Sequence, residues 1–186
     1  IAGPVLFPGD DGYAEETGGF NLTYRPGPAV VVGATSADDV AAAVRHAVAT
    51  GRRIAVQATG HGLSCDLFGT VLVSTRRMTD VVIDPVARTA RVGAGVRWRA
   101  VIDAAAPHGL APLNGSSSDV GVVGYTTGGG LGPMARRYGF AADHVRRFTL
   151  VTADGAVRDV TPSSEPDLFW AVRGGKGNFG VVTDIE

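Results

Sequence analysis

The residue best placed to do chemistry is a histidine in a glycine-rich turn. Residues 58–65 read ATGHGLSC, so His61 stands between Gly60 and Gly62. The turn follows the apolar run 54–56, which predicts a strand that ends at this loop. A neutral imidazole can act as a nucleophile, a base or a ligand near neutral pH. His61 is therefore the first candidate functional residue, and an exposed turn histidine is the alternative.

Glycine is enriched in three loops of this chain. There are 27 glycines in 186 residues, about twice the usual share of roughly 7%. They concentrate in residues 59–62, in 121–132 (GVVGYTTGGGLG) and in 173–182 (RGGKGNFGVV). Glycine loops expose main-chain N–H groups and let a phosphate come close. Tight connections explain any single loop, but three such loops in one domain favour a nucleotide cofactor.

Two widespread nucleotide-binding motifs are missing. A dinucleotide fingerprint needs G-x-G-x-x-G between the first strand and its helix, whereas VGATSADD has one glycine. A P-loop needs a hydroxyl residue after its lysine, and Gly177 follows Lys176 here. The sequence therefore argues against a Rossmann domain and against an NTPase.

Composition narrows the class of protein further. Apolar residues make up 45% and charged residues 19%, which is typical of a globular domain. The net charge of -1 argues against a nucleic-acid partner, and no apolar run reaches the roughly 18 residues of a membrane span. The first residues lack a secretion-signal pattern, so we expect a cytoplasmic protein, with a signal already removed as the alternative. Abundant Ala, Arg and Val suggest a GC-rich bacterial source.

A single cysteine, Cys65, limits the redox and metal chemistry of the chain. One cysteine forms no internal disulfide and no cysteine metal site, so we expect no metal and an inert Cys65. The sequons at Asn21 and Asn114 are interpreted as chance matches.

The hydrophobic pattern predicts a β-α-β start. Residues 30–32 predict a buried strand, and Ser36 with Asp39 three residues later predicts a helix N-terminus. Val40, Val44 and Val48 share one helical face, and Gly51 ends the helix. Residues 54–57 then form the next strand. The histidine loop therefore follows the second strand of this unit.

The rest of the chain alternates strands, hairpins and helices. Strands are predicted at 71–73 and 181–186, and hairpins at 81–92, around Asp84-Pro85, and at 148–160, around Asp154-Gly155. Helices are predicted at 97–108 and after Pro166, with Gly174 past the end of the latter. We therefore expect one α+β domain with mixed sheets.

Five segments, in order, resemble the PCMH-type FAD-binding domain of the vanillyl-alcohol oxidase superfamily, and within it the berberine-bridge-enzyme-like FAD-linked oxidases. They are YRPGPAVVVGATSADDVAAAVRHAVATG, ATGHG, VRWRAVIDAAAPHGLAPLNGSS, VGVVGYTTGGGLGPMARRYGFAADHV and EPDLFWAVRGGKGNFGVVT. Each is weak alone, but their order is specific. The resemblance implies two α/β subdomains with mixed sheets, a lead-in at 1–25 and the FAD-binding domain at 26–186.

The resemblance also implies how FAD is attached. His61 stands where the family bonds a histidine to the flavin 8α-methyl carbon. Many relatives add a cysteine link at a place that falls near Ser117 here. Serine is no substitute for a thiolate, so a monocovalent FAD is expected. Tyr125 stands where many relatives carry a histidine, which leaves its role open.

Further cofactor contacts follow from the same resemblance. The glycines 128–130 would bring backbone to the isoalloxazine and ribityl groups, and residues 180–182 would meet the adenine end. Asp143 is either a turn cap or a neighbour of cofactor-side loops, whereas Phe169 and Trp170 are expected in the core. The expected cofactor-binding residues are Ala58, Thr59, Gly60, His61, Gly62, Ser64, Ser117, Asp119, Val120, Gly121, Gly124, Tyr125, Gly128, Gly129, Gly130, Gly180, Val181 and Val182.

Three functional hypotheses remain open at this level. The first is the flavin domain of an oxidase that transfers hydride from an alcohol, sugar or secondary metabolite to flavin N5 and then reduces O2 to H2O2. The second is a dehydrogenase that uses another acceptor, and the third is a flavin-binding or partner-binding fragment without turnover. The family's substrate domain and C-terminal segment are not in this sequence, so no catalytic base is assigned. A truncated chain or a second chain would account for this, and the apolar surface left uncovered would favour self-association.

Overall fold

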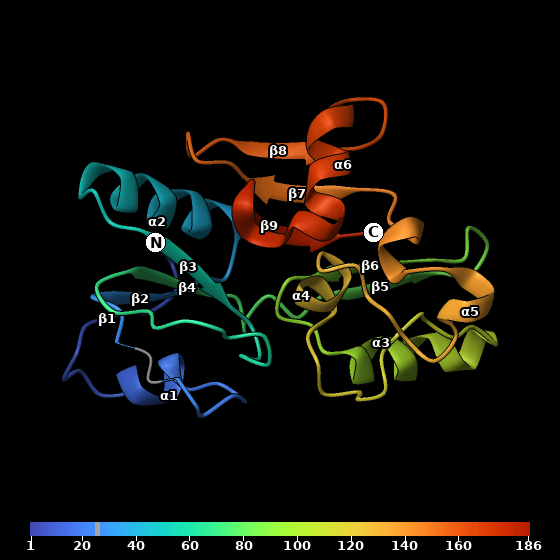
Figure 1. The fold of residues 1–186 in the computed structure, drawn as a ribbon, viewed down its shortest axis with the longest axis horizontal. Helices are drawn as coiled ribbons and strands as arrows, with labels where there is room; N and C mark the ends of the chain where they lie inside the picture. Colours follow the sequence, from blue (N-terminus) through green and yellow to red (C-terminus); the bar gives the residue numbers. More distant parts are fainter. Residues whose placement is uncertain (25–26) are drawn as a thin grey trace.

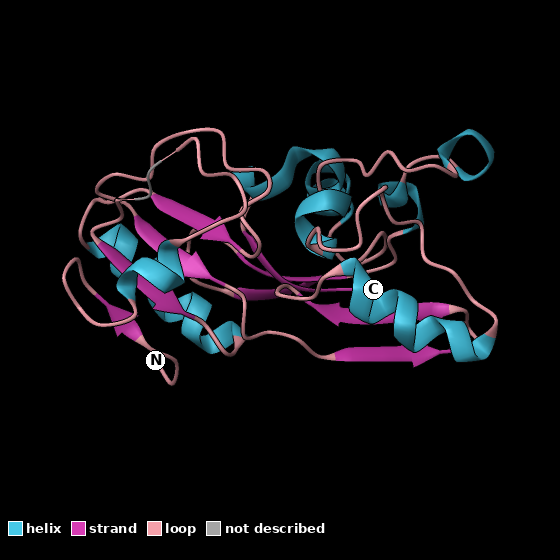
Figure 2. Cartoon of the chain, turned by 90° about the horizontal axis from the view of Figure 1, so that it is seen from below, coloured by secondary structure: helices cyan, strands magenta, loops and turns pink. Residues whose placement is uncertain are grey.

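The chain forms two β-sheets with helices packed around them (Figure 1). The computed structural model describes residues 1–24 and 27–186. Figure 2 shows the strands of both sheets from below, with helices flanking them. The strands are β1 (Val5–Leu6), β2 (Val30–Gly33), β3 (Ile54–Gln57), β4 (Val71–Ser74), β5 (Val81–Asp84), β6 (Thr89–Gly93), β7 (Phe148–Val151), β8 (Val157–Val160) and β9 (Val181–Ile185). The α-helices are α1 (Tyr13–Thr17), α2 (Ala37–Ala49), α3 (Trp98–Ala105), α4 (Val122–Thr126), α5 (Ala135–Tyr138) and α6 (Pro166–Gly175), and the 3-10 turns are η1 (Ala106–His108), η2 (Ala141–His144) and η3 (Lys176–Asn178).

The first sheet is mixed and has the strand order β1-β2-β4-β3. Strands β2 and β3 both pair in parallel with β4, so the predicted β-α-β unit is confirmed, with a third strand inserted at its centre. Strand β1 is antiparallel to β2 at one edge. Alternate residues of β2 and β4 face opposite sides of the sheet, where α1 and α2 cover them (Figure 1).

Helix α2 begins as its sequence predicts. The Ser36 hydroxyl accepts a hydrogen bond from the Asp39 main-chain N–H at 3.2 Å. Val40 and Val44 are buried, but Val48 is 66% exposed, so the expected apolar face is one turn too long. Ala47 in the same turn is buried, so the last turn packs through its alanine side and presents Val48 to solvent.

The buried carboxylate of Asp39 ties the N-terminus of the chain to this helix. Its oxygens accept hydrogen bonds from the Thr35 hydroxyl and from the N–H groups of Thr35, Ala2 and Gly3. Burial alone would raise the pKa of Asp39, but these hydrogen bonds outweigh burial and lower the pKa to about 2. The charged form is therefore favoured in the folded state.

This arrangement predicts an acid-sensitive anchor. A folded-state pKa below the unfolded value stabilises the protein above pH 4, and that stability is lost as the pH falls toward 2. We expect Asp39→Asn to lower the free energy of unfolding by about 2 kcal/mol at pH 7. The difference from the parent protein should shrink below pH 4, as urea unfolding at several pH values would measure. A constant difference from pH 7 to pH 2 would contradict the assignment.

The second sheet is antiparallel throughout its described strands, in the order β5-β6-β9-β7-β8. Both predicted hairpins are confirmed. Asp84 accepts hydrogen bonds from the N–H groups of Val86 and Ala87, which closes the first turn. In the second, Asp154 accepts a hydrogen bond from the Ala156 N–H at 3.1 Å within a loop of five residues. The strand predicted from residue 181 is β9, which lies at the centre of this sheet.

The predicted helices agree with the structure except at their ends. The helix expected at 97–108 is α3 followed by the 3-10 turn η1, and Gly109 then turns with φ +66°. The helix after Pro166 loses helical geometry at Arg173 and at Gly174, which has φ +115°, so regular helix ends near the predicted place. The expected boundary between 1–25 and 26–186 lies at residues 25 and 26, outside the described residues.

Helix α2 connects the two sheets through a shared apolar core. It contacts β2 and β4 of the first sheet and β7, β8 and β9 of the second. Val151 and Val181 of the second sheet are buried in the same cluster as Val40 and Val44. A second cluster around Phe148, Leu150 and Phe169 fills the space between the second sheet and helices α3 and α6. This packing fixes the loops at the strand ends relative to one another.

Among the described residues, helices are too short or too polar to cross a lipid bilayer. The same part of the chain holds no group of three or more His, Cys, Asp or Glu side chains arranged for a metal ion.

Candidate functional site

The histidine loop leaves the carboxyl end of β3 and pairs with the N-terminal segment. The Phe20 N–H donates to the Thr59 carbonyl at 2.9 Å, and the Asn21 N–H donates to the Gly60 carbonyl at 3.2 Å. Gly60 has φ +73°, and a β-carbon added to it would lie 2.6 Å from the Gly19 Cα. Glycine is therefore required at position 60 by both its conformation and its neighbour.

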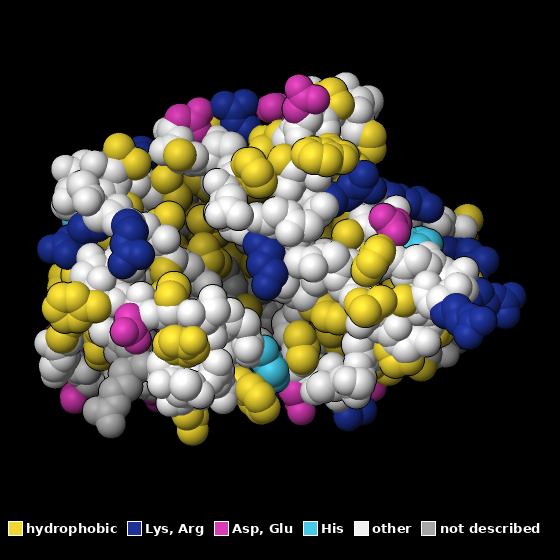
Figure 3. All heavy atoms as spheres, in the orientation of Figure 1, with side chains coloured by type: hydrophobic (Ala, Val, Ile, Leu, Met, Phe, Trp, Pro, Cys, Tyr) yellow, Lys and Arg dark blue, Asp and Glu magenta, His cyan; other side chains and the backbone are white. Residues whose placement is uncertain are grey.

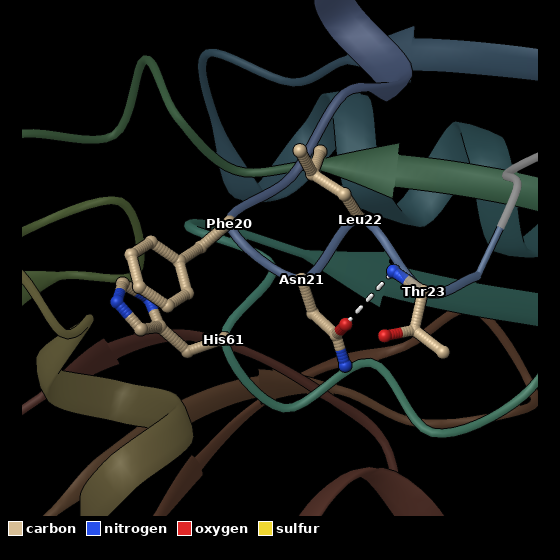
Figure 4. Close-up of a pocket in the computed structure, with 5 residues that line it drawn as sticks. All are labelled: Phe20, Asn21, Leu22, Thr23 and His61. Carbon is tan, nitrogen blue, oxygen red and sulfur yellow. Dashed lines mark hydrogen bonds between the residues drawn. The ribbon is translucent and has the colours of Figure 1, made fainter.

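The His61 ring is held on two sides. It stacks on the Phe20 ring, with 4.0 Å between the ring centroids and 12° between their planes (Figure 4). Its Nδ1 atom lies 2.8 Å from the Thr59 Oγ1 atom. The other ring nitrogen, Nε2, makes no hydrogen bond within residues 1–24 and 27–186. The ring is thus oriented while one nitrogen stays available.

The surroundings of His61 favour its neutral form. Burial lowers the pKa of His61, the positive charge of Arg97 lowers it further, and Asp119 raises it by a smaller amount. The net pKa lies below the ordinary value of 6.5. A neutral imidazole with a free nitrogen is a nucleophile at neutral pH.

An open hollow of about 670 Å³ lies beside this ring. It is lined by His61 and by the segment that pairs with its loop, namely Phe20, Asn21, Leu22 and Thr23 (Figure 4). Figure 3 shows the surface recessed between the two sheets, with a histidine and basic side chains at the border. The volume is sufficient for part of a large organic ligand.

The three glycine loops meet at this place. A β-carbon added to Gly121 would lie 3.6 Å from the Thr59 Oγ1 atom, so the second loop adjoins the first. The third loop joins the second because the N–H groups of Gly174 and Lys176 both donate to the Thr127 carbonyl, at 2.8 and 3.3 Å. The three glycine-rich loops, which begin near residues 59, 121 and 174, therefore lie next to one another in the tertiary structure, as expected.

The second loop contains a helix that the sequence analysis did not predict. Residues 122–126 form α4, and its N-terminal residue Gly121 is buried. Gly124 lies on the exposed face of α4, where an added β-carbon would meet no atom within 4 Å. The glycine-rich pattern concealed the helix because glycine lowers helical propensity while buried Val122 and Val123 anchor it.

The Tyr125 side chain packs into a slot with glycine walls. Its ring meets Trp98 edge-on at 5.6 Å, and β-carbons added to Gly130 and Gly132 would lie 2.7 and 2.9 Å from the tyrosine. The hydroxyl is buried and has no hydrogen-bond partner in the described part of the chain, and burial raises the pKa of Tyr125. An unpaired buried hydroxyl is a candidate ligand-binding group.

The glycines at 128–130 have different environments. Gly128 is exposed and a β-carbon added to it would lie 2.6 Å from the Lys176 Cε atom. The carbonyls of Gly129 and Gly130 instead accept hydrogen bonds from Ala142 and Ala141 of η2, at 3.0 and 2.9 Å. Only Gly128 of the three is in contact with the third loop.

The residues before α4 belong to a short paired segment. The Val120 carbonyl accepts a hydrogen bond from the Trp98 N–H at 3.1 Å. The Ser117 hydroxyl is exposed and accepts from the Asp119 N–H at 3.3 Å. Asp119 is exposed and close enough to His61 to raise the pKa of its imidazole.

Asp143 accepts a hydrogen bond from the Phe140 N–H, so it caps a turn, which is one of the two roles expected for it.

The last predicted group, residues 180–182, lies in the sheet. A β-carbon added to Gly180 would lie 2.5 Å from the Leu150 Cδ1 atom, so packing on β7 accounts for this glycine. The side chains of Val181 and Val182 are buried in the two cores, which leaves only their main-chain groups for a ligand.

Phe169 is buried as expected, whereas Trp170 is 73% exposed and is not a core residue. Helix α6 presents it to solvent.

Sequence reasoning missed several residues of the site. Ala58 was expected, but not Arg76, whose Nε atom donates to the Ala58 carbonyl at 3.1 Å. Phe20 lies 41 positions before His61, and no local pattern indicates their contact.

Ser64 and Cys65 are exposed in the loop after the histidine. The sequon at Asn21 is structural here, because its side-chain amide donates to the Leu63 carbonyl at 3.0 Å.

Comparisons with known proteins agree with this geometry. Residues 28–161 match the family described as FAD binding domain. The chain is 36% identical to (R)-6-hydroxynicotine oxidase of Paenarthrobacter nicotinovorans over 100% of its own length and 41% of that protein. The crystal structure of 6-hydroxy-D-nicotine oxidase from Arthrobacter nicotinovorans superposes with a TM-score of 0.94, at 36% identity, over 100% of this chain and 41% of that one.

A third relative bears on the histidine. The Acremonium strictum glucooligosaccharide oxidase, described as carrying a 6-S-cysteinyl, 8α-N1-histidyl FAD, has a TM-score of 0.90 at 28% identity, over 98% of this chain and 39% of that one. This chain thus spans about two fifths of the length of the relatives it matches. The family match, the relatives named as oxidases and the two-sheet fold agree with one another. The chain belongs to the FAD-binding domain family and has the fold of the FAD-binding part of berberine-bridge-enzyme-like proteins of the vanillyl-alcohol oxidase superfamily.

Proposed function

We propose that this chain is the flavin half of an oxidase and that His61 is its covalent anchor for FAD. The observation that carries the proposal is the meeting of three glycine loops around an oriented, neutral histidine. The residues fit the cofactor on structural grounds. The loops leave room for a ligand beside His61, and Tyr125 presents a buried hydroxyl without a partner.

The geometry favours attachment through the Nε2 atom of His61. Nδ1 is engaged with the Thr59 hydroxyl, whereas Nε2 is available. Forming a bond from Nε2 to the 8α-methyl carbon removes one hydrogen atom from the imidazole and one from the methyl group. In this proposal O2 accepts both and yields H2O2. Thr59 holds the ring so that the nucleophilic nitrogen is the one that faces away from the loop.

A single link is proposed because the chain offers no second one. The glucooligosaccharide oxidase carries a cysteinyl link in addition to the histidyl link. Here Ser117 occupies the expected place, and Cys65 is exposed in the histidine loop. A serine hydroxyl is far less ionised than a thiol near neutral pH, so it does not replace the second bond.

The proposed reaction is removal of hydride from a small organic substrate, followed by reduction of O2. Bound FAD supplies the hydride-accepting N5 atom and the two-electron chemistry. The described residues would contribute the binding site and, through His61, the histidyl anchor. The relatives named above act on hydroxynicotine and oligosaccharides, which supports an amine or an alcohol as substrate. A substrate-binding part outside this chain is proposed to complete the site.

Acid precipitation of the full-length protein tests the histidyl anchor. We expect yellow flavin to remain with the wild-type pellet and to pass into the supernatant for His61→Ala, because only a covalent bond survives unfolding. A His108→Ala variant, which changes an exposed histidine remote in sequence from the loop, is the matched control and should retain flavin. NMR of the isolated flavinyl peptide identifies the substituted nitrogen. Wild-type flavin in the supernatant would refute the covalent link.

The electron acceptor is tested separately. Turnover with O2 should exceed turnover with an artificial dye under anaerobic conditions, and H2O2 should form in equal amount to the oxidised substrate. Turnover with the dye alone would identify a dehydrogenase instead.

A further inference from the structure

The backbone at Lys176 has a conformation that a residue with a side chain rarely adopts. Its φ is +53° and its ψ is -139°, a region that belongs mainly to glycine. Glycines stand on both sides of it, at 175 and 177, so a glycine at 176 would continue the loop without strain. A lysine held in this conformation costs free energy, which makes a function for its side chain worth testing.

The lysine side chain lies where the three glycine loops meet. A β-carbon added to Gly128 would be 2.6 Å from its Cε atom and 3.4 Å from its Nζ atom. A β-carbon added to Gly62, the neighbour of His61, would be 4.0 Å from the Nζ atom. The Lys176 N–H also donates to the Thr127 carbonyl at 3.3 Å. The ammonium is therefore directed along the first and second loops and not away from the molecule.

The charge of this ammonium is not compensated by the protein around it. Across the described residues, no carboxylate lies within ion-pair distance of Lys176. The neighbouring positions that its side chain approaches in the first and second loops are the glycines 62 and 128. A strained cation without a carboxylate partner in the described protein is suited to an anion.

We propose that Lys176 is a cofactor-binding residue whose ammonium pairs with a negatively charged group of FAD. The inference rests on the proposed function, because it requires that FAD occupies the junction of the loops. FAD offers two such groups: the pyrophosphate, which is charged in both redox states, and the pyrimidine side of the ring, which gains negative charge on reduction. Contact with the anion offsets the backbone strain at position 176.

Binding measurements on full-length protein test this pairing. All variants are made with His61→Ala, so that FAD binds reversibly to apo-protein and its Kd can be measured by fluorescence titration. We expect Lys176→Met to raise the Kd for FAD about tenfold or more, because a charge-assisted contact is lost, and Lys176→Arg to stay close to the parent. The FAD affinity of the Met variant should also depend less on salt.

A glycine substitution separates function from folding. Lys176→Gly should leave the Tm of the apo-protein unchanged or higher, because the strain is relieved, and should still raise the Kd for FAD. The matched control is Arg88→Gly, because Arg88 has φ +56° in the exposed turn between β5 and β6. That variant should also relieve strain but leave FAD affinity unchanged. These opposite effects on stability and binding are not expected of a merely structural lysine.

Two further measurements identify the anionic group. If Lys176 pairs with the pyrophosphate, Lys176→Met weakens the binding of ADP as much as that of FAD. If it pairs with the reduced ring, ADP binding is unchanged and the midpoint potential of the bound flavin becomes more negative. Unchanged FAD affinity, ADP affinity and potential in a parent that binds FAD would overturn this inference alone. A parent that binds no FAD would overturn the proposed function and this inference with it.

Discussion

Replacing Phe148 with alanine is expected to lower the free energy of unfolding by about 3–5 kcal/mol. Phe148 begins β7 and is 0% exposed, and its ring lies 5.7 Å from that of Phe169 on α6. It stands beside Ile185 on one neighbouring strand and Val160 on the other. The cavity is therefore bounded by sheet and helix on all sides, so it has little freedom to collapse.

The effect is large relative to the total stability of a domain, which is commonly about 5–15 kcal/mol. Thermal unfolding of the full-length protein should show the melting temperature of this domain lowered by roughly 6–20 °C. Phe68→Ala is the matched control, because Phe68 is 83% exposed and its loss should change the free energy of unfolding by less than about 0.5 kcal/mol. Equal losses for the two variants would show that the core is not organised around Phe148.

Replacing Gly60 with alanine is expected to reduce the flavin content of the purified protein about tenfold or more. The added methyl group would lie 2.6 Å from the Gly19 Cα and 3.1 Å from the Phe20 nitrogen, so the paired segment must move away. That movement breaks the Phe20 N–H bond to Thr59 and the stacking of Phe20 on His61. The histidine then loses the orientation on which the proposed attachment of FAD depends.

A second glycine separates this clash from backbone strain. Gly51 follows α2 with φ +61°, close to the φ of Gly60, but a β-carbon added to it would meet no atom within 4 Å. Gly51→Ala should cost about 1 kcal/mol of stability and leave the flavin content unchanged. The ratio of flavin absorbance to protein absorbance measures both variants. Full flavin content in Gly60→Ala would show that the pairing of residues 19–21 with the loop is dispensable.

The sequence determined the elements whose signals are local. Short apolar runs defined β2, β3 and β4, and Ser36 with Asp39 defined the start of α2. The hairpin turns at Asp84 and Asp154 were readable because an aspartate side chain accepts a hydrogen bond from the backbone N–H two residues on. The order of glycine-rich segments was also enough to indicate the family and its cofactor.

Other features were decided by contacts between distant parts of the chain. Helix α4 was hidden because its stability comes from burying Val122 and Val123, and the glycines around it argue against a helix. Val48 and Trp170 are apolar but exposed, because each lies on the outer side of its helix while neighbours in the same turn, Ala47 and Phe169, are buried. An apolar side chain therefore does not by itself show which side of a helix packs against the core.

The candidate site divides in the same way. The sequence by itself determined His61 and the glycines beside it, because a reactive residue type and a permissive backbone are properties of single positions. Only the tertiary structure decided that Phe20 stacks on that histidine, that Thr59 engages Nδ1, and that Lys176 lies against the loops. Some of these contacts join residues that are far apart in the chain, and others depend on the backbone angles φ and ψ. A residue's type and its spacing from its neighbours determine neither the contacts between remote residues nor the local backbone angles.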